Sequence, residues 1–479
     1  MTTPFFPALR VRLAAMGRRQ FHALRQLHFP ALLEELRQWI PPQLLASEEE
    51  GPNSRDRVFS LRLTFECFVW QMLKPRTACR EVVRAVQALF ESVGRGQVDE
   101  GTSAYIQARQ RLPRTRLEKI LVHTARQADG RVGGQSKLNG RAVKVVDCST
   151  TQLPDTSKNQ KRYPQYSGQK PGCGFPLLKF AVLFSLSSGA ILRVAMSHWR
   201  FHELRLLRRL LPGLNQGDIL LGDRSYGEYV TMAWLPKQGV DVVARMHGSR
   251  KIDFRKAAKC FAKNDGLFQW RKARQISGIL SPAQWRAIPE TIVVRIIRFD
   301  AVVRRKKKRI TLVTTLLDPK LYPADQLITL YARRWNLELA LRHLKTTLGM
   351  ELLRCQTPDT AEKELLVYLI AYNLVRCLMA VTVALAGVEM ERLSFKGTVD
   401  TLRQYTLAMA RTPQRRKRQH LWDKLLTTIA LDLVPLRPCR NEPRAVKRRP
   451  KAYQLLSKPR HVFREVPHRA RYRKNRELI

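Results

Sequence analysis

Two aspartates of this chain stand where acidic side chains could hold a divalent cation. Asp147 and Asp223 each end a short apolar run, RAVKVVD and DILLGD, that is typical of a buried strand. Ligands of open α/β sheets bind beside the carboxyl ends of strands, so both acids are expected at one crevice. Two carboxylates in a cleft repel each other unless a cation lies between them, and Mg²⁺ prefers oxygen ligands. The alternative is that each aspartate caps a turn.

A second group of residues follows in YARRWNLELALRHLK, whose apolar spacing predicts a helix. At about 100° per residue, one stripe about 60° wide carries Tyr331, Arg334, Glu338 and Lys345. A salt-bridged, solvent-facing side of the helix is the alternative, because charges four residues apart usually pair there. The apolar neighbours favour a stripe that borders the core; these are Trp335, Leu339, Leu341, Leu344 and Leu348.

The spacing Y-x2-R-x3-E-x6-K resembles the signature of the YREK group of bacterial insertion-sequence transposases, the type of insertion sequence family four. These enzymes are DDE transposases, and VVDCST with Asp147 and LLGDRSYGEY with Asp223 resemble the two earlier acids of their triad. The long interval before Glu338 is similar to the group as well, since a β-strand domain is inserted there. LLRCQTPD and, in the tail, EPRAVKRRPKAY also resemble the group. The resemblance spans roughly residues 100–460, and no motif matches in the N-terminal helical part.

This resemblance implies an α/β fold with a ribonuclease-H-like catalytic core that is interrupted by a β-rich insertion domain. It also implies that Asp147, Asp223 and Glu338 are catalytic and hold two Mg²⁺ ions, for which Mn²⁺ can substitute. Asp147 would bridge both ions, and the other two acids would bind one ion each. Two such ions stabilise the attacking and leaving oxygens of an in-line displacement. Water would cut the element's end, and the freed 3′-hydroxyl would attack target DNA without a covalent protein–DNA intermediate.

The other residues of the stripe are expected to hold DNA. Arg334 and Lys345 would bind phosphates near the scissile bond, and Tyr331 would donate a hydrogen bond to a phosphate. The resemblance further implies that this group holds a flipped base on an aromatic side chain of the inserted domain, for which Trp270 and Trp285 are the candidates. Core packing is the alternative for each tryptophan.

The charge of the chain indicates the same kind of partner. Its 479 residues hold 87 Lys and Arg against 39 Asp and Glu, a formal net charge of +48, while 44% of residues are hydrophobic as in globular proteins. A folded chain with so much uncompensated charge repels itself unless a polyanion covers it. This disfavours an enzyme of small metabolites and leaves double-stranded DNA as the expected partner. A polybasic protein of the membrane surface is the alternative.

Three features predict a cytoplasmic protein that is associated with the bacterial nucleoid. The eight cysteines are scattered without C-x2-C spacing, which disfavours a zinc ribbon or a disulfide framework. Arg10 and Arg12 interrupt the N-terminal segment where a signal peptide needs an apolar run. The uninterrupted apolar run 377–388 is too short to span a bilayer. We therefore expect no membrane contact and a buried core helix at this run.

The N-terminal part, residues 1–135, is expected to be a helical DNA-binding domain. Helical patterns at 58–73 and 77–93 precede a helix that starts near Ser103 and carries Arg109 and Arg111. A basic second helix of this kind could enter a major groove. A plain helical bundle with solvated arginines is the alternative.

Four further regions complete the expected layout. Strands are predicted at 141–147, 179–187, 190–196, 218–223 and 240–245, with a hairpin at Ser188-Gly189, and helices at 324–348 and 360–388. The regions are the first core part (136–248), the β-strand insertion (249–320), the second core part (321–390), and a helical, basic C-terminal region for DNA contact or dimerisation (391–479). In this last region, residues 437–479 hold 15 Lys and Arg against three acids and should stay extended until they meet a polyanion.

The sequence therefore predicts a transposase that binds insertion-sequence ends and catalyses metal-dependent end cleavage and strand transfer into target DNA. Its partners would be the element's terminal repeats, the target DNA and a second copy of the chain, because joining two ends requires two active sites. One alternative is a catalytically inactive or repurposed sequence-specific DNA-binding protein. Another is a different ribonuclease-H-like nuclease, which would cleave without strand transfer.

Overall fold

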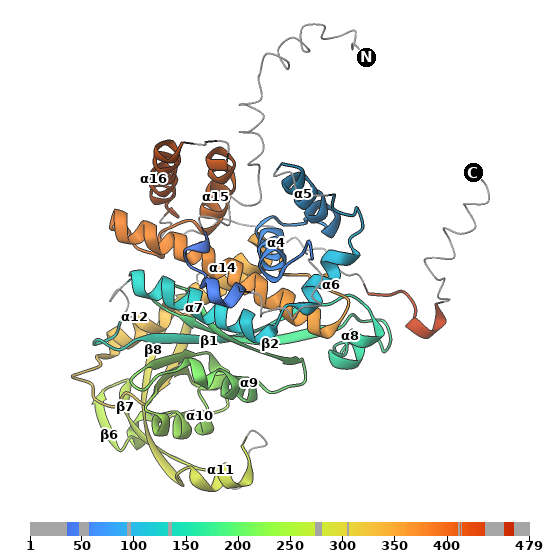
Figure 1. Ribbon diagram of the computed structural model, residues 1–479. Coiled ribbons are helices and arrows are strands. Elements are labelled where there is room, and N and C mark those ends of the chain that lie inside the picture. The colour runs from blue at the N-terminus through green and yellow to red at the C-terminus, as the bar shows by residue number, and fades with distance from the viewer. Residues whose placement is uncertain are drawn as a thin grey trace, which may run out of the picture.

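One mixed β-sheet runs through the molecule and carries helices on both faces (Figure 1). Its nine strands have the order β3-β2-β1-β4-β5-β9-β8-β7-β6. The computed structural model describes residues 36–46, 57–92, 97–132, 137–273, 280–303, 306–410, 412, 414–435 and 455–463.

The first five strands match the five that were predicted from the sequence. They are β1 (Val143–Gln152), β2 (Leu177–Ser185), β3 (Ile191–His198), β4 (Ile219–Gly222) and β5 (Asp241–Arg245). The predicted hairpin between β2 and β3 is confirmed, with Gly189 at φ +67° in its turn. β1 is antiparallel to β2 but parallel to β4, and β4 is parallel to β5. The carboxyl ends of β1, β4 and β5 therefore lie at one edge of the sheet.

Four more strands extend the same sheet beyond β5. They are β6 (Lys259–Ala262), β7 (Asp265–Arg271), β8 (Thr291–Val303) and β9 (Lys306–Thr314). β9 pairs antiparallel with the end of β5, so the strand-rich segment is continuous with the main sheet. The buried Arg295 of β8 forks onto Asp265 of β7, with Nε–Oδ1 at 2.8 Å, and donates to the carbonyl of Tyr322 at 2.6 Å. This ion pair ties the added strands to the chain that leads back into the core.

Helices α7 (Arg114–Val132) and α14 (Pro358–Ala386) pack together on one face of the sheet (Figure 1). Buried Asn373 of α14 accepts from the amide of Ile191 and donates to the carbonyls of Ile191 and Leu121, which fixes both helices to β3. By length and composition, α14 could cross a membrane, but 72% of its most apolar stretch is buried inside the protein. The prediction of a buried core helix is confirmed.

The remaining helices surround this core. The N-terminal helices α4, α5 and α6 lie close to their predicted positions, and α15 and α16 pack as a pair beyond α14 (Figure 1). On the other face of the sheet, α9 and α10 lie with α11 further out. The bounds are α4 (Leu61–Leu73), α5 (Cys79–Ser92), α6 (Ser103–Arg111), α8 (Ser157–Arg162), α9 (Glu203–Leu210), α10 (Tyr229–Trp234), α11 (Pro282–Ala287), α15 (Phe395–Ala410) and α16 (Arg415–Leu431).

The prediction of one helix over 324–348 is wrong, because this segment folds as three pieces. Helix α12 (Ala324–Ala332) ends where the Arg334 amide bonds to the carbonyl of Tyr331, three residues back. Helix α13 (Trp335–Arg342) follows and ends in a π-helical turn, His343–Thr347. Tightened and widened turns of this kind change the direction of side chains without changing the apolar spacing that the sequence displays.

Candidate active site

Asp147 lies in the middle of β1, two residues beyond the last residue of that strand that pairs with β4. The prediction that the strand ends at Asp147 is wrong, because pairing with β2 continues it to Gln152. The amide of Cys148 donates to its Oδ1 at 2.8 Å, and the side chain is half-buried. Burial raises the pKa of Asp147 to about 6; the Cys148 hydrogen bond and the nearby Arg334 oppose this rise, and Asp223 and Glu338 add to it. The charge of Asp147 therefore senses both other acids of the predicted triad.

Asp223 follows the neighbouring strand β4 at the same level as Asp147. Val145 of β1 pairs with Leu221 of β4, and each acid comes two residues after its member of that pair. Asp223 caps a short 3₁₀ turn, since its Oδ1 accepts from the amide of Ser225 at 2.8 Å. Asp223 therefore caps a turn, as the alternative interpretation expected, and it also lies level with Asp147. Its Oδ2 can make other contacts.

Glu338 comes from α13, which packs against β1. The guanidinium of Arg334, at the start of this helix, donates to its Oε1 at 3.0 Å. Burial opposes the charge of Arg334, but Tyr331, Glu338 and Asp147 more than compensate, so its pKa lies above the ordinary value. Arg334 therefore supplies positive charge among the acids in this structure.

The donor chemistry of the three acids fits hard divalent cations, which take carboxylate oxygens. In the part of the chain that the structure describes, no three His, Cys, Asp or Glu side chains come close enough together to hold a metal ion. In this structure Oε1 of Glu338 is paired with the guanidinium of Arg334 at 3.0 Å.

Tyr331 and Lys345 are half-buried beside the acids. Burial raises the pKa of Tyr331, against the opposing charges of Arg334 and Arg245, and the guanidinium of Arg334 lies 5.8 Å from the centre of its ring. Burial lowers the pKa of Lys345, against the attraction of Glu351 and Asp147. The structure thus brings the predicted stripe residues to one charged site although the helix is broken.

The chain is similar to known transposases. Residues 139–374 match the family model described as the transposase DDE domain. Over 438 residues the chain is 24% identical to the transposase InsG for insertion sequence element IS4 of Escherichia coli (strain K12), covering 89% of this chain and 94% of that protein. Residues 139–374 are therefore a transposase DDE domain. The family resemblance that the motifs carried is confirmed, and the matched region contains Asp147, Asp223 and Glu338.

A solved structure is also similar to the transposase. The piggyBac transposase synaptic complex with hairpin DNA superposes with a TM-score of 0.42 at 10% sequence identity, covering 83% of this chain and 82% of that chain.

Two site residues of the transposase were not singled out from the sequence. Arg245 ends β5, beside the strand that leads to Asp223, and its charge acts on Tyr331. The sequence signal for Arg245 was a third predicted strand that ends in a charged residue at the same sheet edge. Trp335 was expected to border the core, but 53% of its surface is exposed next to Arg334. Its indole is available to a ligand.

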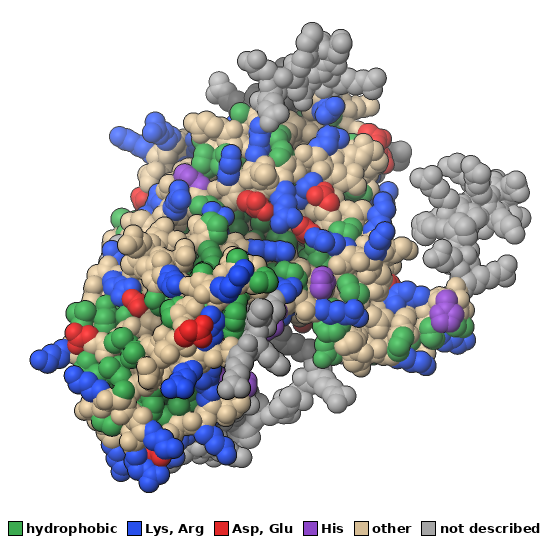
Figure 2. All heavy atoms as spheres, turned by 90° about the horizontal axis from the view of Figure 1, so that it is seen from below, with side chains coloured by type: hydrophobic (Ala, Val, Ile, Leu, Met, Phe, Trp, Pro, Cys, Tyr) green, Lys and Arg blue, Asp and Glu red, His purple; other side chains and the backbone are tan. Residues whose placement is uncertain are grey.

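A basic groove of about 360 Å³ continues from Arg245 onto the added strands. Its cationic lining comes from the end of β5, the loop after it, and strands β8 and β9. The space-filling view of this lower side of the molecule shows many more Lys and Arg than Asp and Glu side chains (Figure 2). The charged lining residues are Arg245, His247, Arg250, Lys251, Arg298 and Arg309.

The two tryptophans that were predicted to stack on a base are buried. Trp270 of β7 is 5% exposed, and the guanidinium of Arg250 lies 4.2 Å from its ring centre. Trp285 of α11 is 8% exposed, with Lys272 above its ring. Core packing describes both in this structure. Stacking of DNA on Trp270 would require Arg250 to leave the ring, and it stays a prediction.

The structure does not support the predicted DNA contact of Arg109. This side chain is buried among the N-terminal helices. Its guanidinium lies 5.0 Å from the ring centres of both Phe68 and Tyr105. Only the exposed face of α6 could meet DNA, and there Arg111 is exposed at the helix end. The prediction for Arg111 therefore stands as made.

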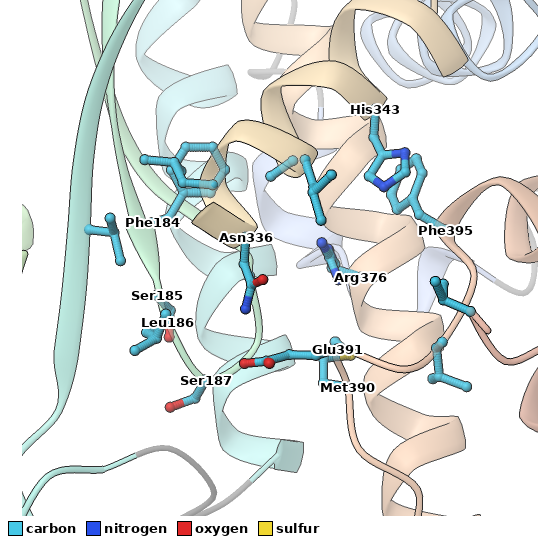
Figure 3. Close-up of a pocket in the computed structure, with 17 residues that line it drawn as sticks. Phe184, Ser185, Leu186, Ser187, Asn336, His343, Arg376, Met390, Glu391 and Phe395 are labelled. Carbon is cyan, nitrogen blue, oxygen red and sulfur yellow. The ribbon is translucent and has the colours of Figure 1, made fainter. Parts of the chain in front are cut away.

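A small cavity of about 110 Å³ lies beside α13 (Figure 3). Asn336 and His343 line it from the helical side and Phe184 from β2, while Arg376 and Glu391 add polar groups. The ring of His343 stacks on Phe395 at 4.8 Å, and burial lowers its pKa to about 4. This cavity separates the helix that carries Glu338 from the C-terminal helices.

Proposed function

We propose that Asp147, Asp223 and Glu338 are the catalytic acids of this transposase and hold two Mg²⁺ ions, for which Mn²⁺ can substitute. DDE transposases use divalent metal ions and catalyse DNA cleavage and strand transfer. The observation that carries the assignment is geometric: the register of β1 and β4 sets Asp147 and Asp223 level with each other, and α13, which carries Glu338, packs against β1. Bound ions would stabilise the attacking and leaving oxygens of the phosphoryl transfer.

The chain's own residues prepare the site for this chemistry. A carboxyl group must lose its proton to bind a metal, so the raised pKa of Asp147 makes metal affinity rise with pH through about 6. Arg334 holds Glu338 in the metal-free protein and is close enough to bind a DNA phosphate when that carboxylate turns away. Lys345 and Tyr331 flank the acids as further phosphate partners. Arg245, at the end of β5, lines the basic groove.

The same proposal includes the layout of the core and its insertion, the DNA substrates and the oligomeric state. Strands β1 to β5, with helices on both faces, form a ribonuclease-H-like core, and β6 to β9 form its insertion. The mixed sheet with the acids at one edge supports this layout. The transposase acts on its element's terminal repeats and on target DNA at the bacterial nucleoid. It does so as a homodimer, since each joined end requires its own active site.

Replacement of the acids one at a time tests the assignment. Asp147→Asn, Asp223→Asn and Glu338→Gln should each reduce single-turnover cleavage of an end-containing DNA by at least about 10³-fold while binding of that DNA survives. Asp325→Asn is the matched control, because it removes one exposed acid from α12. Cleavage by any purified triad variant at the wild-type rate would remove that residue from the site.

The substrate outcome separates transposition from simple nuclease activity. With Mg²⁺, the wild-type protein should join the 3′-hydroxyl of a pre-cut end to a target plasmid. A protein that nicks the end but never forms the joined product would be a nuclease of the same fold. Binding without any metal-dependent cleavage would indicate a repurposed DNA-binding protein.

A further inference from the structure

A short C-terminal segment returns to the catalytic region and docks beside α8 (Figure 1). We call this segment, residues 455–463, the strap. It contacts the connection between β1 and β2, residues 153–176, which we call the docking loop. The docking loop follows Gln152, the last residue of β1, which lies five residues beyond Asp147 in the same strand.

The side chain of Arg460 fills a receptor that the docking loop builds from oxygen atoms. Its Nε lies 2.6 and 2.7 Å from the two carboxylate oxygens of Asp155. Its Nη1 donates to the carbonyl of Gly172 at 2.7 Å, and its Nη2 donates to the carbonyl of Gly174. A planar guanidinium can satisfy all of these acceptors at once, whereas an ammonium cannot.

Backbone contacts secure the strap on either side of this side chain. The amide of Leu456 donates to the carbonyl of Cys173 at 3.0 Å, and the amide of Arg460 donates to that of Gly172 at 3.1 Å. Gly172 has φ +73°, and a Cβ on it would lie 3.3 Å from the Cβ of Pro459. The docking loop therefore has a backbone shape that suits the strap and favours glycine at the contact.

The docked strap holds a surface that is suited to nucleic acid. Between its fixed ends, the docking loop exposes four cations together with Tyr166, which is 49% exposed and packs edge-on against Trp199 at 4.9 Å. Cations beside an exposed aromatic ring offer a phosphate backbone and a base contact together. The exposed cations are Lys158, Lys161, Arg162 and Lys170.

Hydrogen bonds also link the end of β1 and the docking loop to the segment between the π-helical turn and α14. Thr151, at the end of β1, donates to the carbonyl of Met350, and Thr156 donates to the carbonyl of Gln356 at 2.8 Å. The accepting segment directly follows the π-helical turn that carries Lys345. The shape of the docking loop is thus connected to both β1 and the helix end at the active site.

We propose that Arg460 is a positioning residue, through which the strap holds the docking loop as a DNA-contact surface next to the catalytic acids. The inference rests on the proposed function only in taking DNA as the ligand. Arg460 itself contacts Asp155 and the loop carbonyls, and the exposed cations of the loop contact phosphates. The strap thereby makes the C-terminal end of the chain part of the catalytic region's DNA surface.

Hydrogen exchange of the full-length protein tests the positioning step without any cleavage. Arg460→Ala and Asp155→Ala should each speed amide exchange in peptides covering 153–176 by about tenfold or more, because the loop loses its partner. Lys458→Ala, which removes an exposed cation of the same strap, should leave exchange unchanged. Unchanged exchange in Arg460→Ala would overturn the proposal. If that variant exchanges faster throughout the main sheet, Arg460→Lys decides, and wild-type exchange in it would equally overturn the proposal.

Binding of end-containing DNA tests the contact surface. Arg460→Ala should weaken binding about as much as replacement of Lys158, Lys161, Arg162 and Lys170 together by Ala. Both variants should also lower the salt dependence of binding, by about 0.9 in slope for each phosphate that the protein no longer neutralises. Lys458→Ala should change the slope by less.

Two outcomes of the binding experiment would contradict the proposal. One is an equal effect of Lys458→Ala and Arg460→Ala, and the other is an unchanged slope in the loop variant. Asp147→Asn separates this proposal from the catalytic assignment. Cleavage by that variant would contradict the catalytic assignment, whereas the exchange and binding measurements would still test the strap.

Discussion

At the scale of single residues, the site is organised by Arg334 as much as by the acids. Its guanidinium pairs with Glu338 at 3.0 Å and attracts Asp147, so it offsets carboxylate repulsion before any metal binds. The neighbouring Arg333 points elsewhere and pairs with Glu391, with Nε–Oε1 at 2.9 Å. The two adjacent arginines thus pair with different glutamates, so Arg333 is a matched control for substitutions of Arg334.

We expect Arg334→Ala to impair end processing far more than DNA affinity. Loss of a charged group aimed at the reacting phosphate should slow single-turnover cleavage by about 10²-fold or more, while affinity for end DNA falls less than tenfold. Arg333→Ala should stay close to wild type in cleavage. Equal losses of cleavage and affinity in Arg334→Ala would show that this arginine only adds general positive charge.

Glu228 lowers the stability of the folded protein as the pH rises, because its pKa is raised on folding. Burial raises the pKa of this carboxyl to about 7 against the opposing Arg250, and its Oε1 is buried without a hydrogen-bond partner among the described residues. The folded state therefore keeps a proton that the unfolded state releases near its ordinary pKa of about 4.5. The contribution of Glu228 to stability is complete below that value and is lost as pH rises toward 7.

Glu228→Gln should remove this pH dependence, because the amide stays neutral. At pH 8 the variant should be more stable than the wild type by about 2 kcal/mol, and at pH 4 the two should be similar. Urea unfolding at both pH values measures the difference. A variant that is less stable than the wild type at pH 8 would show that the carboxylate is well solvated there.

At the scale of elements, the strands could be predicted from the sequence and the catalytic helix could not. Short apolar runs that end in Asp147, Asp223 and Arg245 gave the strands that carry the sheet edge. The break between α12 and α13 depends on backbone hydrogen bonds that leave apolar spacing unchanged, so the periodicity predicted one straight helix. Continuity of β9 with β5 is a pairing between distant segments, and a strand pattern does not specify its partner.

The ion pair inside the added strands should be essential to their stability. Asp265→Asn leaves the charge of Arg295 buried without its carboxylate, which should cost about 3–5 kcal/mol and speed hydrogen exchange in β7 to β9. Asp300→Asn is the control, because Asp300 makes an exposed pair with Arg309 on the same strands and should cost less than about 1 kcal/mol. Similar losses in the two variants would mean that burial of the first pair has little effect.

At the scale of the whole molecule, charge predicts the partner, and geometry decides where it binds. The sequence has a formal net charge of +48, and among the described residues basic side chains gather in the groove that begins at Arg245 and on the docking loop. Arg109 shows the limit of a charge count, since the fold buries this side chain between aromatic rings. The catalytic role of Asp147, Asp223 and Glu338 stays a prediction, which the sequence allowed because residue types and their order are set by chemistry. Arg245, Trp335 and the strap depend on contacts between distant segments.

Part of the basic tail can be removed without touching the strap. Truncation after Phe463 deletes six Lys and Arg and two acids, so it should weaken DNA binding and reduce the slope of log K against log salt. Binding isotherms at several salt concentrations measure this slope for the truncated and full-length proteins. An unchanged slope would show that residues 464–479 do not contact DNA.

The most direct test of the central claim is to count bound metal by electron paramagnetic resonance during titration of Mn²⁺ into the full-length transposase on end DNA. We expect wild-type protein to bind Mn²⁺, and Asp147→Asn, Asp223→Asn and Glu338→Gln each to lose at least one ion or weaken its binding by more than tenfold. Asp325→Asn should bind as the wild type does. Wild-type Mn²⁺ binding in any of the three triad variants would contradict a shared site formed by these acids.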